Sequence, residues 1–208
     1  IQAVTAFTES PGWEKRAAQL KSFENIIDIG IHLNLTESFP NSPPKYPLNK
    51  LLLLSHLRLI NKKMIKDSFR KQIILFKDQM GRLPDFLDGH QHVHAFPIIN
   101  QALQEVIQEL WGKGSPPYVR DSSKLNIFSN GFFVKKIVLL LACRGLSKKM
   151  KAIQIPTPPF FTGVYDFAAG QSVTAQVADG EGNISRSWWE AVVPHVSAGY
   201  SEYGANSL

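Results

Sequence analysis

Residues 25–36 read NIIDIGIHLNLT, and from Ile27 onward apolar and polar side chains alternate strictly. The apolar positions are Ile27, Ile29, Ile31, Leu33 and Leu35. Side chains of a strand point alternately to opposite faces, so this period of two predicts a strand with one buried face. The opposite face carries Asp28, Gly30, His32, Asn34 and Thr36, with His32 at its centre.

A second stretch, FLDGHQHVH at residues 86–94, also places polar side chains at alternate positions. In an extended strand, Asp88, His90, His92 and His94 would all point to the same face. On a helix the same side chains would be spread around the cylinder. We therefore interpret the stretch as a strand that presents four ionisable groups on one side.

The segments between and after these stretches show the periods of an α/β protein. Helical patterns lie at 10–20, 51–80, 97–112 and 131–146, and a short strand pattern lies at 117–120. Ser10 is the expected N-cap of the first helix, and Gly81 and Gly112 are the expected ends of the second and third. Strands alternating with helices predict a parallel sheet, and 208 residues suffice for one domain.

Composition excludes several functional classes. The net charge is +6, but the lysines and arginines are scattered through helical patterns without a nucleic-acid motif, so we expect no nucleic-acid partner. The longest apolar run, residues 137–142, is too short to cross a bilayer, so we expect no membrane association. The single cysteine, Cys143, excludes an intrachain disulfide and a multi-cysteine metal site, and we expect a cytoplasmic protein.

His32 and His90 form the candidate site. In a parallel sheet the ends of neighbouring strands meet at one edge, where α/β active sites are built. Imidazole is the commonest protein metal ligand, and Asp88 would hold such a ring in place by accepting its second N–H. A hydrogen-bonded structural role is the alternative for a lone strand histidine such as His32. Three neighbouring imidazoles in a half-buried strand, however, require polar partners or a cation.

Four stretches together resemble one family. They are VTAFTES at 4–10, DIGIHLNLTE at 28–37, RLPDFLDGHQHVHAFP at 82–97 and FFTGVYDF at 160–167. The chain is similar in these stretches to the YdjC-like carbohydrate deacetylases, which include the chitooligosaccharide deacetylases.

The resemblance implies an incomplete or distorted TIM-like (β/α) barrel of parallel strands alternating with helices. It implies one divalent metal ion, Mg²⁺ or Zn²⁺, held by His32 and His90, and hydrolysis of N-acetyl groups on amino sugars or short chitooligosaccharides. His92 and His94 then lie beside the metal and are candidates for substrate contact. Arg120 is a further candidate for substrate binding, with a structural ion pair as its alternative, and a homodimer is compatible with the family.

The two ends of the chain depart from the family pattern. The family opens with a strand that ends in a DDFG-type motif, whose aspartate is a metal ligand and base, and this motif is absent here. At the other end, His195 of VVPHVSAGY is the candidate counterpart of a family HPG or HPA motif, within a divergent tail at about 170–208.

These departures leave three functional hypotheses. The first is a metal-dependent deacetylase, weakly active or inactive as this 208-residue piece. The second is a non-catalytic carbohydrate-binding remnant, a pseudoenzyme of the same fold. The third is another barrel metallohydrolase that uses an H-x-H pair, which the GVYDF stretch at 163–167 disfavours.

Overall fold

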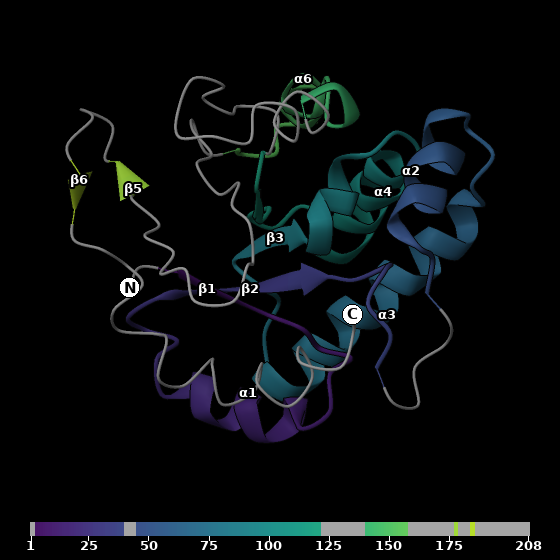
Figure 1. Cartoon of the computed structure of the whole chain (residues 1–208). Coiled ribbons are helices and arrows are strands. Elements are labelled where there is room, and N and C mark those ends of the chain that lie inside the picture. Colours follow the sequence, from purple (N-terminus) through teal and green to yellow (C-terminus); the bar gives the residue numbers. More distant parts are fainter. Residues whose placement is uncertain (1–2, 40–44, 122–139, 158–176, 179–183, 186–208) are drawn as a thin grey trace.

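A computed structural model describes residues 3–39, 45–121 and 140–157 and two short strands near the C-terminus (Figure 1). Its centre is a parallel sheet of four strands in the order β1-β2-β3-β4. The strands are β1 (Ala3–Ala6), β2 (Asp28–Leu33), β3 (Phe86–Gly89) and β4 (Tyr118–Val119). Parallel strands joined through helices confirm the predicted α/β class.

Helices follow the strands along the chain. They are α1 (Trp13–Lys21), α2 (Leu48–His56), α3 (Lys62–Met80), α4 (Ile99–Trp111) and α6 (Leu146–Ala152), with a 3₁₀ segment, η1, at His90–Ala95. In Figure 1, α1 and α3 lie below the strands, and α3 packs against both α1 and α4. The two remaining strands, β5 (Val177–Ala178) and β6 (Ile184–Ser185), form a separate antiparallel pair.

The predicted buried face of β2 is confirmed. Ile29, Ile31 and Leu33 are fully buried, and Ile31 lies between Ala6 of β1 and Leu87 of β3 in the sheet register. The opposite face is covered as well, because an added Cβ at Gly30 would lie 2.5 Å from the Phe86 ring. Burial of both faces is the usual condition of a parallel sheet.

The helix predictions are confirmed in their apolar stripes and wrong at some ends. Gly81 and Gly112 do end α3 and α4. The single predicted helix at 51–80 is two helices, because the helix breaks at Arg58, which has a positive φ of 59°. Asn61 is the N-cap of α3, since its Oδ1 accepts a hydrogen bond from the backbone amide of Met64. Ser10 is not an N-cap: its hydroxyl donates to the Phe7 carbonyl, and α1 begins only at Trp13.

Other predictions stay open. The four strands form an open sheet within the described residues, so closure into a barrel stays a prediction. The predicted helix at 131–146 falls mostly outside the described residues, as does the 170–208 tail apart from β5 and β6. In the part of the chain that is described, no helix combines the length and apolar character needed to cross a membrane.

Candidate functional site

The candidate site lies at the carboxyl edge of the sheet. Because the four strands are parallel, the residues that end or follow them meet at this edge. His32 is near the end of β2, His90 follows β3 and Arg120 follows β4. The rings of His32 and His90 converge there, with their centroids 5.5 Å apart.

The backbone of residues 90–94 differs from the prediction. The strand stops at Gly89, and His90–Ala95 coil into η1, in which Gln91 and His92 have φ values of 51° and 60°. The expectation that Asp88, His90, His92 and His94 share one strand face is therefore wrong. The turn brings the His94 ring back over Gly89, where an added Cβ would lie 2.7 Å from Nδ1 of His94.

Two of the three histidines of this segment, His90 and His94, consequently have different surroundings. His90 is partly exposed, and its Nε2 lies 3.8 Å from Oε2 of Glu37. His94 is fully buried, and its Nε2 lies 2.7 Å from the backbone carbonyl of Arg120. A carbonyl only accepts, so Nε2 donates, and the ring ties η1 to the end of β4. Its burial leaves no surface for the substrate contact expected of His94.

Burial keeps these imidazoles neutral. Desolvation, together with the nearby His32, lowers the pKa of His90 to about 4. Desolvation, with His94 and Arg120 nearby, also lowers the pKa of His92 to about 3. A neutral imidazole is the form that binds metal ions, so His90 is in the ligand-competent state at neutral pH.

Asp88 is the centre of the polar contacts at this edge. Its carboxylate is fully buried, and Oδ1 lies 2.9 Å from the Thr5 hydroxyl and 2.7 Å from Nδ1 of His32. Oδ2 lies 2.8 Å from Nη2 of Arg120. Burial alone would raise the pKa of Asp88, but the charges of Arg120 and His32 outweigh it and hold that pKa well below its usual range. One ionised carboxylate thus joins groups from β1, β2 and the end of β4.

Asp88 therefore positions an imidazole of the neighbouring strand. His32 and Asp88 are direct partners in the register of β2 and β3. Because an ionised carboxylate only accepts, Nδ1 of His32 donates to it. In the neutral form of the ring, Nε2 would then carry the lone pair that binds a metal ion.

Aromatic rings border the two histidines. The Phe7 ring meets His32 and His90 edge to face, at centroid distances of 4.7 Å and 5.2 Å, and Phe39 lies 5.5 Å from Phe7. A buried ion pair at 2.5 Å between Lys45 and Glu9 joins the segments that follow β2 and β1. Phe7, Phe39, Thr5 and Glu37 were not predicted from the sequence.

The donor set fits a divalent cation in part. Two imidazole donors suit Zn²⁺, which binds nitrogen and sulfur, better than Mg²⁺, which prefers an octahedron of oxygens. Within the described residues, however, no group of three or more histidine, cysteine, aspartate or glutamate side chains is arranged to hold a metal. His32 and His90 therefore fit as two ligands of an incomplete shell. His195 lies outside the described residues.

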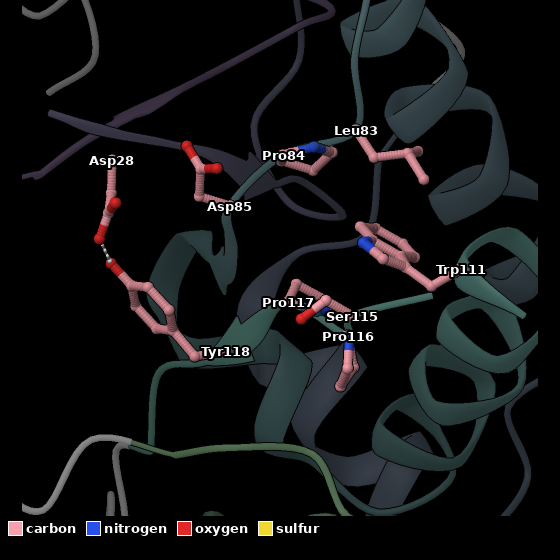
Figure 2. Close-up of a pocket in the computed structure, with 9 residues that line it drawn as sticks. All are labelled: Asp28, Leu83, Pro84, Asp85, Trp111, Ser115, Pro116, Pro117 and Tyr118. Carbon is pink, nitrogen blue, oxygen red and sulfur yellow. Dashed lines mark hydrogen bonds between the residues drawn. The ribbon is translucent and has the colours of Figure 1, made fainter. Parts of the chain in front are cut away.

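A pocket at the other end of the strands is a separate feature (Figure 2). Asp28, Asp85 and Tyr118 line it at or just before the starts of β2, β3 and β4, together with Trp111. Its carboxylates already have structural partners: the Tyr118 hydroxyl donates to Asp28, and Asp85 pairs with Arg82. The pocket therefore takes no part in the His32–His90 arrangement.

Comparison with known proteins relates this chain to carbohydrate deacetylases. It is 28% identical to the carbohydrate deacetylase of Mus musculus over 95 residues, which cover 39% of this chain and 31% of that protein. The Xenopus laevis carbohydrate deacetylase is 32% identical over 99 residues, covering 40% of this chain and 31% of that protein. The matched region thus spans about a third of these relatives.

A solved structure and a family model complete the comparison. The solved structure, a putative cellobiose-phosphate cleavage protein from Enterococcus faecalis V583, is 19% identical with a TM-score of 0.43, over 69% of this chain and 55% of that chain. The family model described as YdjC-like protein matches residues 1–195. The chain therefore belongs to the YdjC-like protein family.

Proposed function

We propose that the chain carries part of a metal-dependent hydrolase site that removes N-acetyl groups from amino sugars or short chitooligosaccharides. Family membership and the relatives named carbohydrate deacetylase support the reaction class. The observation that carries the proposal is the convergence of the His32 and His90 rings, 5.5 Å apart, at the carboxyl edge of the sheet.

His32 and His90 would hold the ion, for which the imidazole donors favour Zn²⁺ over Mg²⁺. When bound, a divalent ion polarises a carbonyl and lowers the pKa of water, which is the chemistry that amide hydrolysis requires. Asp88 holds His32 through Nδ1, and Oε2 of Glu37 lies 3.8 Å from Nε2 of His90. The side chains of His32 and His90 are similarly exposed, at 18% and 20%.

Acetate release tests the proposed reaction. The purified chain is incubated with N,N′-diacetylchitobiose and Zn²⁺ or Mg²⁺, and acetate is quantified. Slow, metal-dependent acetate release is the expected result. Sugar binding in calorimetry without acetate release would contradict hydrolysis and select the second candidate function below. The absence of both sugar binding and acetate release would overturn the proposal.

The second candidate is a carbohydrate-binding remnant without catalysis. It is favoured by one observation: among the described residues, no group of three or more histidine, cysteine, aspartate or glutamate side chains is arranged to hold a metal ion. A protein that keeps the sugar-binding surface but completes no metal shell would bind the sugar and leave the amide intact.

Phe7 and Phe39 provide the apolar surface for the sugar in this proposal. We expect Phe7→Ala to weaken the binding of N,N′-diacetylchitobiose by up to about tenfold, the loss that roughly 1.4 kcal/mol of aromatic contact produces. Isothermal titration calorimetry measures the affinity. Phe23→Ala is the control, because Phe23 is half exposed beyond the end of α1. Equal affinities of the Phe7→Ala variant and the wild type would remove Phe7 from the substrate surface.

A further inference from the structure

We propose that Arg120 is a positioning residue: its guanidinium fixes the carboxylate of Asp88, which in turn fixes the ring of His32. This inference rests on the proposed function for its significance, because it explains how one of the two metal-binding imidazoles is held. It replaces the expected role of Arg120 in substrate binding.

The first argument is the state of the Asp88 carboxylate. Oδ1 receives two donors, the Thr5 hydroxyl and Nδ1 of His32. Oδ2 is buried and makes no hydrogen bond among the described residues; it forms an ion pair with the Arg120 guanidinium, whose Nη2 lies 2.8 Å away. This ion pair opposes rotation of the carboxylate about its Cβ–Cγ bond. Removal of the guanidinium would leave Oδ2 buried and uncompensated, so the carboxylate would reorient and release His32.

The second argument is that the backbone of Arg120 is held in place by hydrogen bonds. Its backbone amide donates to the carbonyl of Leu87 at 3.0 Å, directly before Asp88. Its backbone carbonyl is 2.7 Å from Nε2 of the buried His94. Both polar backbone groups of Arg120 are therefore anchored, the amide to β3 and the carbonyl to η1, the two consecutive segments that contain and follow Asp88. This anchoring places the guanidinium on Asp88 independently of any substrate.

The third argument is the consequence for His32. A neutral imidazole that donates Nδ1–H to a fixed carboxylate is held in one tautomer, with the lone pair on Nε2. A ring freed from that contact samples both tautomers and both orientations. Through its contact with Asp88, Arg120 therefore determines which nitrogen of His32 is free to bind a metal ion.

The same chain offers a matched control pair. Arg82 binds Asp85 through Nη1 at 2.7 Å and Nη2 at 2.9 Å, and Asp85 also accepts the amide of Ile29. The side chains of Arg82 and Arg120 are similarly exposed, at 30% and 35%. The Arg82–Asp85 pair lies at the opposite end of the strands. Arg82→Met thus removes an arginine of similar exposure from an arginine–aspartate pair away from His32; Asp85 itself is 33% exposed, whereas Asp88 is buried.

The experiment compares wild type, Arg120→Met, Arg120→Lys and Arg82→Met. Long-range ¹H–¹⁵N NMR reports the tautomer of His32, assigned by the loss of its signal in His32→Gln. We expect a single tautomer protonated at Nδ1 in wild type and Arg82→Met, and a tautomer mixture in Arg120→Met. Zn²⁺ titration should show affinity lowered by about 10- to 100-fold in Arg120→Met and unchanged within about twofold in Arg82→Met.

The outcomes separate this inference from the proposed function. A wild type that binds no Zn²⁺ would overturn the proposed metal site, while the NMR comparison would still decide the role of Arg120. An unchanged His32 tautomer in Arg120→Met would overturn the inference. If the sugar affinity of that variant is also weaker, Arg120 would be assigned to substrate binding instead. If Arg120→Met does not fold, the same NMR measurement is made on Arg120→Lys, which keeps the charge but loses the planar guanidinium. A mixture of His32 tautomers in this variant supports the inference, and a single tautomer overturns it.

Discussion

His90→Ala is expected to lower the affinity of the protein for Zn²⁺ by more than about 100-fold. Loss of a group that merely orients a ligand costs about 10- to 100-fold, so loss of a ligand should cost more. The remaining imidazole, His32, cannot alone hold an ion that takes four ligands in most proteins. Equilibrium dialysis followed by elemental analysis measures the bound zinc.

His56→Ala is the control for the His90 substitution. His56 is an exposed imidazole at the end of α2, and its Nδ1 lies 2.8 Å from the Leu52 carbonyl. Its removal should leave the zinc content unchanged. Equal zinc content in His90→Ala and wild type would show that the cation binds elsewhere and would remove the basis of the proposed hydrolase site.

The fold could be predicted wherever a period extended over many residues. The alternation from Ile27 to Leu35 gave β2 and its buried face, and the 3.6-residue stripe gave α3 and its end at Gly81. The four residues of β1 are too few to show a period, so this strand was missed. The break at Arg58 was also missed, because the apolar positions of α2 and α3 merge into one pattern when the chain is read as a single helix.

The site could be predicted in its chemistry and not in its connections. The histidine pair follows from residue type and from the common edge of parallel strands. The partner of Asp88 depends on the register between β2 and β3, which places His32 opposite Asp88 across 56 positions of sequence. Nothing local in either segment encodes that register. Phe7 and Thr5 reach the site for the same reason, through the pairing of β1 with β2.

The turn at Gly89 decides where the histidines point. A strand pattern of alternating histidines continues in the sequence to His94, but the chain leaves the strand after Gly89. Glycine is required at this point by space and not by backbone angle, because its φ is −139°, which any residue adopts. The missing Cβ makes room for the His94 ring and backbone. A glycine within a strand pattern is thus the one local sign that another segment approaches closely.

Gly89→Ala is therefore expected to destabilise the protein by about 1–3 kcal/mol, the usual cost of forcing a methyl group into a packed interior. The new Cβ would lie 2.7 Å from Nδ1 and 3.0 Å from the backbone nitrogen of His94, whose ring is fixed on the Arg120 carbonyl. Urea unfolding of the variant and the wild type measures the free-energy difference. A Gly89→Ala protein as stable as wild type would mean that residues 90–94 continue as an extended strand.

A double-mutant cycle with His94→Ala attributes this cost to the ring. When the imidazole is removed, part of the clash disappears. The destabilisation of the double variant should therefore be smaller than the sum of the two single destabilisations by about 1 kcal/mol. Gly81→Ala is the control: it is also destabilising, because Gly81 has a φ of 79°, but nothing lies within 4 Å of its added Cβ. Its effect should add to that of His94→Ala. Additive effects of Gly89→Ala and His94→Ala would show instead that the His94 ring does not lie over Gly89. The turn that directs His90 toward His32 would then lack support.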